Sequence, residues 1–207
     1  MENSTEKNNE YGVAYDSKRR FISYWHQIRE ILSHEPKRVL EVGVGNGFIS
    51  RYLREHNVDL LTLDYCAELN PDVVADVSAL PFLDGEFDIA AAYEILEHMP
   101  YEKSLQGLGE LRRVSSCWVI ISLPDASPFL RFEFPIPKVK KVQLLFTIPF
   151  HFWCKSPYAK SHEWEIGIQG YPLGRIKSDI QKTGLTLVRT YRVYENPYHR
   201  FFILRKP

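Results

Sequence analysis

Hydrophobic residues recur at helical spacing near the start of the chain and then give way to short continuous runs. Between Ser17 and Leu32 the apolar residues return every three or four positions, which predicts an amphipathic helix closed by Pro36. Apolar runs then predict strands at 38–42, 60–63, 72–75, 87–92 and 117–123. Helical spacing returns at 101–114 and at 173–183, where Gly184 ends it. Strands therefore alternate with helices along most of the chain.

This alternation predicts βαβ units and a mainly parallel sheet. The run at 117–123 is continuously apolar, as expected of a strand that is covered on both faces. The final two runs, 185–194 and 201–205, are separated by the turn-rich link Glu195-Asn196-Pro197-Tyr198. A parallel return needs a crossover of about a dozen residues or more, so these two strands must pair antiparallel. We expect a single α/β domain over residues 1–207, a doubly wound sheet of seven strands that ends in an antiparallel hairpin.

Residues 124–170 are irregular in pattern and rich in prolines and aromatic residues. A connection of this length in a compact domain is usually functional. We expect a lid-like insertion that covers the acceptor site. Because three lysines at 138–141 precede an aromatic-rich run, a weak membrane contact through 138–153 is the alternative.

The composition limits the kinds of binding partner and the cellular compartment that we expect. Lys+Arg and Asp+Glu both number 26, so the formal net charge is zero, which argues against nucleic acid as substrate without excluding it. The three cysteines are scattered, and the first residues are polar and lack the apolar core of a signal peptide. No apolar run reaches the ~18–20 residues that span a bilayer. We expect a cytoplasmic protein; the sequence predicts no oligomeric state.

The strongest chemical signal is the glycine-rich stretch that follows the strand at 38–42. Dinucleotide-binding turns require G-x-G-x-x-G, in which the last glycine allows close packing of helix against strand. Counted from Gly43, that position is Phe48, a bulky residue. The third glycine stands one position early, at Gly47, so the pattern is E-x-G-x-G-x-G beginning at Glu41. This spacing disfavours NAD.

The same pattern resembles motif I of the class I S-adenosylmethionine-dependent methyltransferases. The similarity continues through Leu63-Asp64, 75–82, 87–89 and 94–98, and it covers about residues 37–123. In detail the chain is similar to the small-molecule branch known as type 11. The resemblance implies S-adenosylmethionine as cofactor and the same seven-stranded fold.

The resemblance also implies which residues bind the cofactor. The glycines would leave space for the methionine part of the cofactor. Asp64 would accept hydrogen bonds from the ribose hydroxyls, and Asp76 and the Val77 amide would bind the adenine. The alternatives are that Asp64 only caps a helix and that Asp76 only forms a turn. The full expected set is Glu41, Gly43, Gly45, Asn46, Gly47, Asp64, Tyr65, Asp76, Val77, Ser78 and Tyr93.

Transfer to oxygen or nitrogen usually needs a general base. The Asn/Asp-Pro-Pro-aromatic motif of nucleic-acid amino methyltransferases is replaced here by residues 93–100, which counts against that activity. Glu94-x-x-Glu97-His98 resembles an element that holds a divalent metal in quinone-ring and small-RNA O-methyltransferases. Those sites add a further histidine, for which the sequence offers no convincing counterpart. Three interpretations stay open: a structural loop, His98 as base or substrate contact, and a metal site. We expect no tightly bound metal.

A second candidate base is His162, in the segment Ser161-His162-Glu163-Trp164-Glu165. A histidine flanked by acids has a tunable pKa and can enter the pocket from a lid. The alternative is a surface turn fixed by Trp164. Together these features predict an enzyme that transfers a methyl group from S-adenosylmethionine to a small-molecule or glycan-like acceptor, at oxygen. The alternatives are a metal-assisted O-methyltransferase that uses Glu94, Glu97 and His98, and a non-catalytic S-adenosylmethionine-binding module.

Overall fold

The computed structural model describes residues 11, 15–135, 141–148 and 161–207. Within them, seven strands form one sheet in the order β3-β2-β1-β4-β5-β9-β8. The pairs that join β3, β2, β1, β4 and β5 are parallel, whereas β9 pairs antiparallel with both β5 and β8. The predicted fold class and its C-terminal antiparallel hairpin are confirmed. The strands are β1 (Arg38–Val42), β2 (Asp59–Asp64), β3 (Val73–Val74), β4 (Phe87–Tyr93), β5 (Ser115–Pro124), β8 (Thr186–Arg192) and β9 (His199–Arg205).

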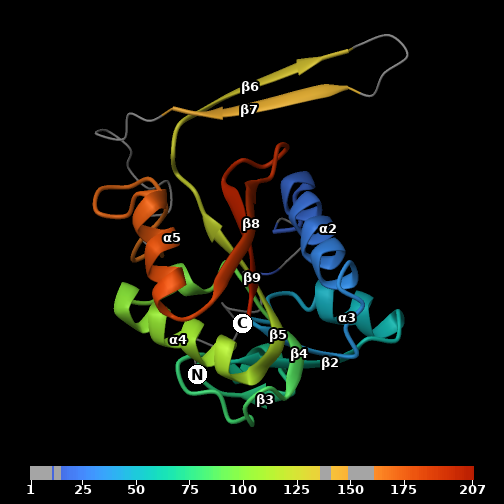
Figure 1. Cartoon of the computed structure of the whole chain (residues 1–207). Coiled ribbons are helices and arrows are strands. Elements are labelled where there is room, and N and C mark those ends of the chain that lie inside the picture. The colour runs from blue at the N-terminus through green and yellow to red at the C-terminus, as the bar shows by residue number, and fades with distance from the viewer. Residues whose placement is uncertain (1–10, 12–14, 136–140, 149–160) are drawn as a thin grey trace, which may run out of the picture.

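Helices cover both faces of this sheet (Figure 1). The helices are α2 (Lys18–Leu32), α3 (Phe48–Glu55), α4 (Tyr101–Val114) and α5 (Leu173–Lys182), with single turns η1 (Ala67–Leu69) and η2 (Leu96–His98). One hydrophobic cluster joins the sheet to α4 and α5, and a second joins it to α2 and α3. The sheet is therefore apolar on both sides, which explains the continuous apolar run predicted for β5.

The buried face of α2 is unexpectedly polar. The spacing of apolar residues predicted the helix correctly. However, Trp25 is 56% exposed, while Ser23 and Glu30 are buried. The reason lies in the antiparallel hairpin at the end of the chain. The Ser23 hydroxyl shares a hydrogen bond with Nδ1 of His199 at 2.9 Å, and the Tyr191 hydroxyl donates to Glu30 at 2.7 Å. Buried polar groups are tolerated where such partners exist.

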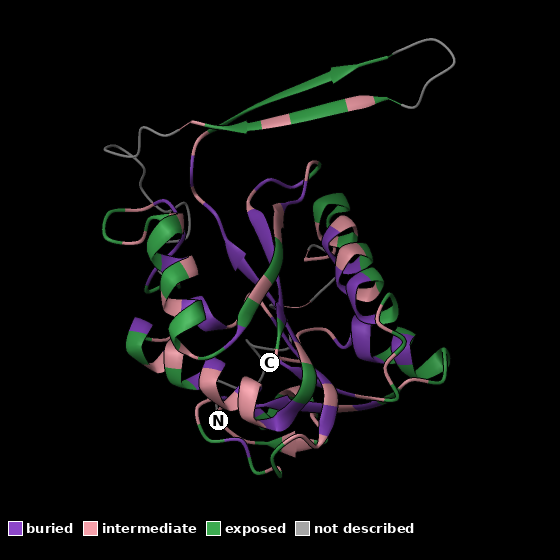
Figure 2. Cartoon of the chain, viewed as in Figure 1, coloured by how far each residue is buried: buried purple, intermediate pink, exposed green. Residues whose placement is uncertain are grey.

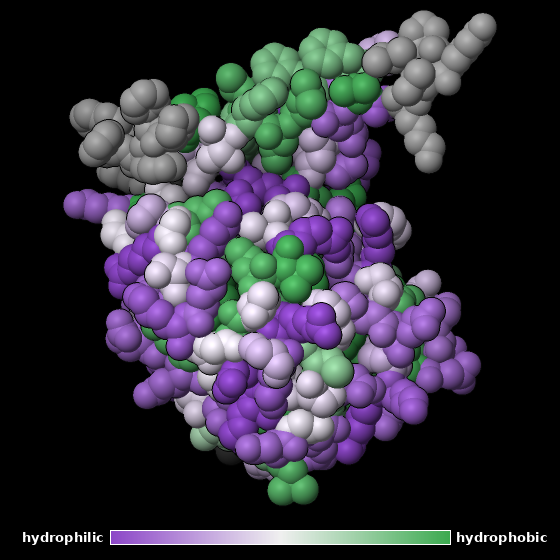
Figure 3. All heavy atoms as spheres, viewed as in Figure 1, coloured by the Kyte–Doolittle hydropathy of each residue, from purple (hydrophilic) through white to green (hydrophobic). Residues whose placement is uncertain are grey.

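The insertion contains a second, two-stranded sheet that the sequence pattern did not predict. Strands β6 (Phe129–Phe134) and β7 (Val142–Thr147) pair antiparallel and extend beyond the main body (Figure 1). Most of their residues are exposed, as Figure 2 shows, and apolar side chains gather over them in Figure 3. The exposed large side chains are Phe129, Leu130, Phe132, Phe134, Leu144 and Phe146. Residues 130–134 do alternate apolar and polar side chains, which is a strand signal within a segment that is otherwise irregular in pattern.

Residues 136–140 and 149–160 lie outside the described part of the chain. The lid role of 124–170 and the membrane contact through 138–153 therefore stay predictions. No helix among the described residues is long and apolar enough to cross a membrane.

A buried ion pair fixes the base of this insertion to the main sheet. Asp125 follows β5 directly, is 1% exposed and accepts a hydrogen bond from Nε of Arg200 at 2.7 Å. Nη2 of Arg192 donates to the backbone oxygens of Asp125 and Ser127, both at 3.0 Å. The carboxylate of Asp125 thus balances two arginines inside the protein.

We expect Asp125→Ala to lower the free energy of unfolding by about 3–5 kcal/mol, because it leaves buried guanidinium groups without a counter-charge. Urea unfolding monitored by circular dichroism measures this. Asp84→Ala is the control, because Asp84 pairs with Arg113 but is 78% exposed, and such a pair contributes less than about 1 kcal/mol. Equal effects of the two variants would contradict the buried network.

Candidate functional site

The glycine-rich turn joins β1 to α3 at the carboxyl end of the sheet. The amide of Gly43 donates to the carbonyl of Leu63 at 2.8 Å, which ties the turn to β2. Gly43 has φ +88°, and a Cβ there would lie 2.1 Å from Cδ1 of Ile95. Gly45 has φ +54°, and a Cβ there would meet only Tyr11, at 3.8 Å. Gly43 therefore allows Ile95 to approach, whereas a Cβ on Gly45 would make only ordinary contact with the described residues.

Asp64 holds this turn from the end of β2. The side chain is buried, and its Oδ2 accepts from the Val44 amide at 2.9 Å. Its Oδ1 accepts from the Cys66 amide, also at 2.9 Å. A carboxylate that accepts two hydrogen bonds keeps capacity for more, because each oxygen has two lone pairs. Asp64 therefore shapes the turn and can still accept from a ligand.

Asp76 forms a turn, as the alternative interpretation expected. Its Oδ1 accepts from the amide of Ser78 at 2.9 Å and from the Ser78 hydroxyl at 2.7 Å. Its Oδ2 accepts from Nζ of Lys103 at 2.6 Å, and this bond, followed by the Ser78 amide, lowers the pKa of Asp76 to about 2. Val77 is buried against Gly107. Because both side chains of the Asp76–Lys103 pair are more than 40% exposed, a ligand can replace the lysine at small energetic cost.

Glu41 lies buried within β1, below the turn. Burial raises the pKa of its carboxyl to about 8. Its Oε2 accepts no hydrogen bond from any residue that the structure describes. A buried acceptor without a donor costs about 1–3 kcal/mol. Glu41 therefore has one carboxyl oxygen that lacks a donor among the described residues and can receive one from a ligand.

The remaining members of the expected cofactor set have varied surroundings. Asn46 donates to Asp16 and accepts from the Phe48 amide, so it closes the turn before α3. Gly47 is the N-cap of α3, with φ +69°. Tyr65 is 74% exposed beside Asp64. Tyr93 donates from its hydroxyl to the carbonyl of Gln27 in α2. Contact of these residues with a cofactor stays a prediction.

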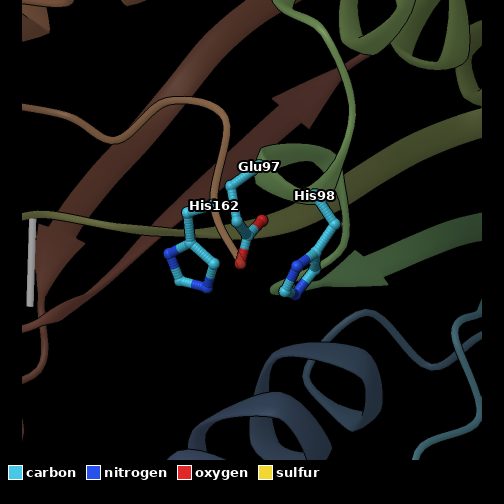
Figure 4. Close-up of side chains that lie close together, drawn as sticks. All are labelled: Glu97, His98 and His162. Carbon is cyan, nitrogen blue, oxygen red and sulfur yellow. The ribbon is translucent and has the colours of Figure 1, made fainter. Parts of the chain in front are cut away.

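A second group of side chains lies close to the same edge. Glu97, His98 and His162 each offer one metal-ligating atom, and these atoms lie within 4.8 Å of one another. Figure 4 shows the Glu97 carboxylate between the two imidazole rings. The ring centroids of His98 and His162 are 4.8 Å apart. Both histidines were proposed from sequence, but their meeting was not, and it supplies the further histidine that the sequence had not revealed.

The backbone explains why His162 reaches this place. The Glu163 amide donates to the carbonyl of Glu97 at 2.8 Å, which docks the segment onto η2. Trp164 is buried, and its Nε1 donates to the carbonyl of Leu96 and to the hydroxyl of Ser104. Trp164 does fix the segment, as one interpretation expected, but the side chain of His162 is only 10% exposed. His162 therefore points inward, although Ser161 and Glu163 on either side of it are exposed.

Two further bonds orient the imidazoles. Nδ1 of His98 lies 2.8 Å from the carbonyl oxygen of Ser161. Nδ1 of His162 lies 2.9 Å from Oε1 of Glu165, whose side chain is fully buried. Carbonyl and carboxylate oxygens only accept, so each Nδ1 carries the proton, and each Nε2 holds the lone pair. Glu165 is a residue whose role the sequence did not indicate, although the acids that flank His162 were its signal.

Buried acidic side chains with raised pKa values characterise this group. Glu97 is 0% exposed, and neither carboxylate oxygen accepts a hydrogen bond from a described residue. Burial, followed by the charge of Glu94, raises the pKa of Glu97 well above its usual range. Burial also raises the pKa of Glu94 to about 7. Oε1 of Glu94 lies 3.8 Å from Nδ1 of His199, so Glu94 faces a different histidine.

The family comparison fits this geometry. Residues 40–116 match the family model described as a methyltransferase domain, of type 11. These residues form a class I methyltransferase domain. The match spans the glycine turn, Asp64, Asp76 and the Glu97-His98 pair, and it confirms the resemblance to S-adenosylmethionine-dependent enzymes.

Solved structures share the fold of this chain. A Burkholderia thailandensis 1,6-didemethyltoxoflavin-N1-methyltransferase, with 1,6-didemethyltoxoflavin and S-adenosylhomocysteine bound, has a TM-score of 0.65 at 15% identity, covering 98% of this chain and 86% of that one. An Aquifex aeolicus methyltransferase has a TM-score of 0.61 at 15% identity, covering 100% of both chains. Magnesium protoporphyrin IX methyltransferase from Synechocystis, with S-adenosylmethionine bound, has a TM-score of 0.60 at 11% identity, covering 100% and 85%. None of the curated protein sequences matches the chain.

The buried acids predict how the stability of this methyltransferase changes with pH. The folded-state pKa of Glu41 is about 8, above its ordinary 4.5, so the folded state holds the extra proton. This contribution to stability is complete below about pH 4.5 and is lost as the pH rises through 8. We expect stability to fall between pH 5.5 and 8, by up to about 1.4 kcal/mol per pH unit for each such group.

Glu41→Gln cannot ionise, so its unfolding free energy should fall less steeply over this range than that of the wild type. Urea unfolding of the ligand-free protein at several pH values gives both slopes. Equal slopes would contradict the assignment of a raised pKa to Glu41.

Proposed function

We propose that this methyltransferase transfers the methyl group of S-adenosylmethionine to the oxygen of a small-molecule or glycan-like acceptor. The observation that carries the proposal is the contact between the glycine turn and the histidine group. Ile95 packs on Gly43, and its carbonyl accepts from the amide of His98 at 3.2 Å. One short segment thus links the turn expected to hold the cofactor with the side chains expected to act on the acceptor.

The residues at the turn fit the cofactor. Glu41 would receive the ammonium of the methionine part, which would satisfy its buried Oε2. Asp64 would accept from the ribose hydroxyls, in addition to the two amides that it already binds. Asp76 would exchange Lys103 for the adenine amino group. When bound, S-adenosylmethionine supplies a methyl carbon on a positively charged sulfur, which makes that carbon electrophilic.

The histidine group fits an acceptor hydroxyl. A hydroxyl oxygen attacks the methyl carbon well only if its proton is removed. Nε2 of His98 and Nε2 of His162 have the lone pairs for that task. Glu165 would hold His162 in this tautomer and would stabilise the imidazolium that forms. The residues of the chain thus orient the acceptor and take up its proton.

The solved relatives support a small-molecule acceptor. The Burkholderia enzyme was crystallised with 1,6-didemethyltoxoflavin, and the Synechocystis enzyme is named for magnesium protoporphyrin IX. The first is an N1-methyltransferase, so nitrogen is the competing acceptor atom. The two imidazoles beside the buried Glu97 favour oxygen here. The zero net charge disfavours nucleic acid as acceptor. The cytoplasmic location expected from sequence stays a prediction.

Cofactor binding should stabilise the folded protein. At about 100 times Kd a ligand that binds only the native state adds about 2.7 kcal/mol, or several degrees in Tm. We expect S-adenosylhomocysteine to produce this shift and NAD to produce none. A shift with NAD alone would refute the cofactor assignment.

Asp64→Ala should weaken S-adenosylhomocysteine binding by about 10- to 100-fold, because hydrogen bonds to a charged acceptor contribute about 1.5–3 kcal/mol each. Calorimetry measures the affinity, and circular dichroism checks the fold. Asp64→Asn is a second variant that keeps the shape of the side chain, in case Asp64→Ala loosens the turn. Asp59→Asn, at the exposed start of β2, should bind as the wild type does. Unchanged affinity in folded Asp64 variants would exclude the ribose role.

His98→Ala should lower turnover by about 10²–10⁴-fold while the affinity for S-adenosylhomocysteine is kept, because the imidazole acts on the acceptor. Turnover is measured against a panel of hydroxyl-bearing and amine-bearing acceptors. His56→Ala, at the exposed end of α3, is the control and should retain turnover. If His98→Ala loses only thermal stability and keeps its turnover, the residue is structural.

A further inference from the structure

We propose that Glu97, His98 and His162 bind one divalent first-row transition-metal cation, such as Mn²⁺, Fe²⁺, Co²⁺ or Zn²⁺. The cation would bind the acceptor hydroxyl, a role that rests on the proposed function, whereas the cation site itself rests on geometry alone. This inference departs from the expectation of no tightly bound metal and from the Glu94/Glu97/His98 set weighed from sequence. The structure joins His162, rather than Glu94, to Glu97 and His98.

The positions of the three side chains are the first reason. Their ligating atoms lie within 4.8 Å of one another, and all three side chains converge in Figure 4. Bonds to one such cation are about 2.0–2.2 Å long, which places the ligand atoms about 3–4 Å apart. Small rotations about side-chain bonds are enough to reach that arrangement. The backbone bond between Glu163 and Glu97 already holds η2 against the segment that carries His162.

The orientation of both imidazoles is the second reason. Histidines that bind metals almost always donate their other N–H to a carboxylate or a backbone carbonyl, which fixes the ring and the tautomer. His98 meets the carbonyl of Ser161 in this way, and His162 meets the carboxylate of Glu165. The Tyr198 hydroxyl lies 3.4 Å from the same nitrogen of His162. Two independent rings are therefore oriented by an acceptor at Nδ1, and each ring offers one ligating atom to the group.

The burial of Glu97 is the third reason. A fully buried carboxylate is stable only if it is paired, protonated or bound to a metal. Neither of its oxygens accepts a hydrogen bond from the described residues, and Glu94 and Glu165 add negative charge nearby. The charge of Arg20 lowers the pKa of Glu97, but by less than Glu94 and Glu165 raise it. A divalent cation supplies the missing positive charge at the place where the carboxylate points.

The donor set selects the class of cation. Two imidazoles and one carboxylate suit Mn, Fe, Co and Zn ions, and this trio with open positions is typical of catalytic sites. Mg²⁺ prefers oxygen ligands and keeps its waters, so it should bind this group weakly.

The cation would change one step of the transfer. A hydroxyl bound to a divalent cation loses its proton more easily, because the positive charge stabilises the alkoxide. The proton passes to solvent, the oxygen forms a bond with the methyl carbon, and the carbon–sulfur bond breaks with its electron pair staying on sulfur. The products are the methyl ether and neutral S-adenosylhomocysteine, so charge and atoms balance.

The test uses the full chain without an affinity tag, stripped of metal with a chelator. Co²⁺ is added, and its visible absorption reports coordination by nitrogen and oxygen; calorimetry with Mn²⁺, Zn²⁺ and Mg²⁺ gives affinities and stoichiometry. We expect one Co²⁺ per chain, and Mg²⁺ bound at least about 100-fold more weakly than Mn²⁺ or Zn²⁺. Glu97→Gln and His162→Ala should abolish the Co²⁺ spectrum. Glu165→Gln should weaken binding by about 10- to 100-fold.

Two variants separate metal binding from folding. Glu97→Gln keeps the side-chain volume and removes the buried charge, so its metal-free Tm should equal or exceed that of the metal-free wild type. His56→Ala removes an exposed histidine elsewhere and should keep one Co²⁺ per chain. Co²⁺ binding that is the same in Glu97→Gln and wild type would overturn the site, and so would the absence of any bound cation.

The two proposals fail differently. If metal-free protein binds S-adenosylhomocysteine and methylates its acceptor at the full rate, the cation has no role in transfer and the methyltransferase proposal stands. If the cation binds as expected but no acceptor is methylated with or without it, the cation site stands and the proposed transfer to oxygen fails.

Discussion

The organisation of this end of the molecule depends on carboxylates that are buried without matching positive charge. Glu41 lies below the glycine turn, Glu97 lies beside two histidines, and Glu94 lies between them along the chain. Burying an ionised carboxylate alone is costly, so each must be protonated or must receive a partner. The fold tolerates this cost because the surrounding sheet and helices form a large apolar core. These buried carboxylates lower the stability of the ligand-free protein, and they lie where we expect ligands with positive charge to bind.

One short stretch of chain joins the two halves of the site. Ile95 fills the space before Gly43, and the residues after it turn through η2 to present Glu97 and His98. The segment that begins at Ser161 then docks on η2 through a backbone bond and through Trp164. A change in the glycine turn would therefore shift Ile95 and, through it, the histidine group. This coupling gives a physical reason why cofactor and acceptor would be aligned with each other.

The parts of the fold that the sequence predicted are those governed by local pattern. The strand at 38–42 and the helix at 101–114 agree with the structure because continuous apolar runs and amphipathic spacing are local signals. The β6–β7 hairpin was not predicted, although residues 130–134 alternate apolar and polar side chains, because they lie within a proline-rich stretch of otherwise irregular pattern. The polar face of α2 was missed because its partners belong to β8 and β9, far along the chain. The same holds for the site: Asp64 follows from its place after β2, whereas the meeting of His98 with His162 depends on contacts between distant segments.

The measurement that tests the central claim most directly is a crystal structure of the protein with S-adenosylhomocysteine, with anomalous data collected after soaking in Mn²⁺. We expect the cofactor product to contact Gly45, Asp64 and Asp76, with its sulfur facing Glu97, His98 and His162, and an anomalous peak among these three side chains. The product bound elsewhere, or its sulfur turned away from the histidines, would contradict the proposed transfer. A properly placed product with no anomalous peak would refute the cation site alone.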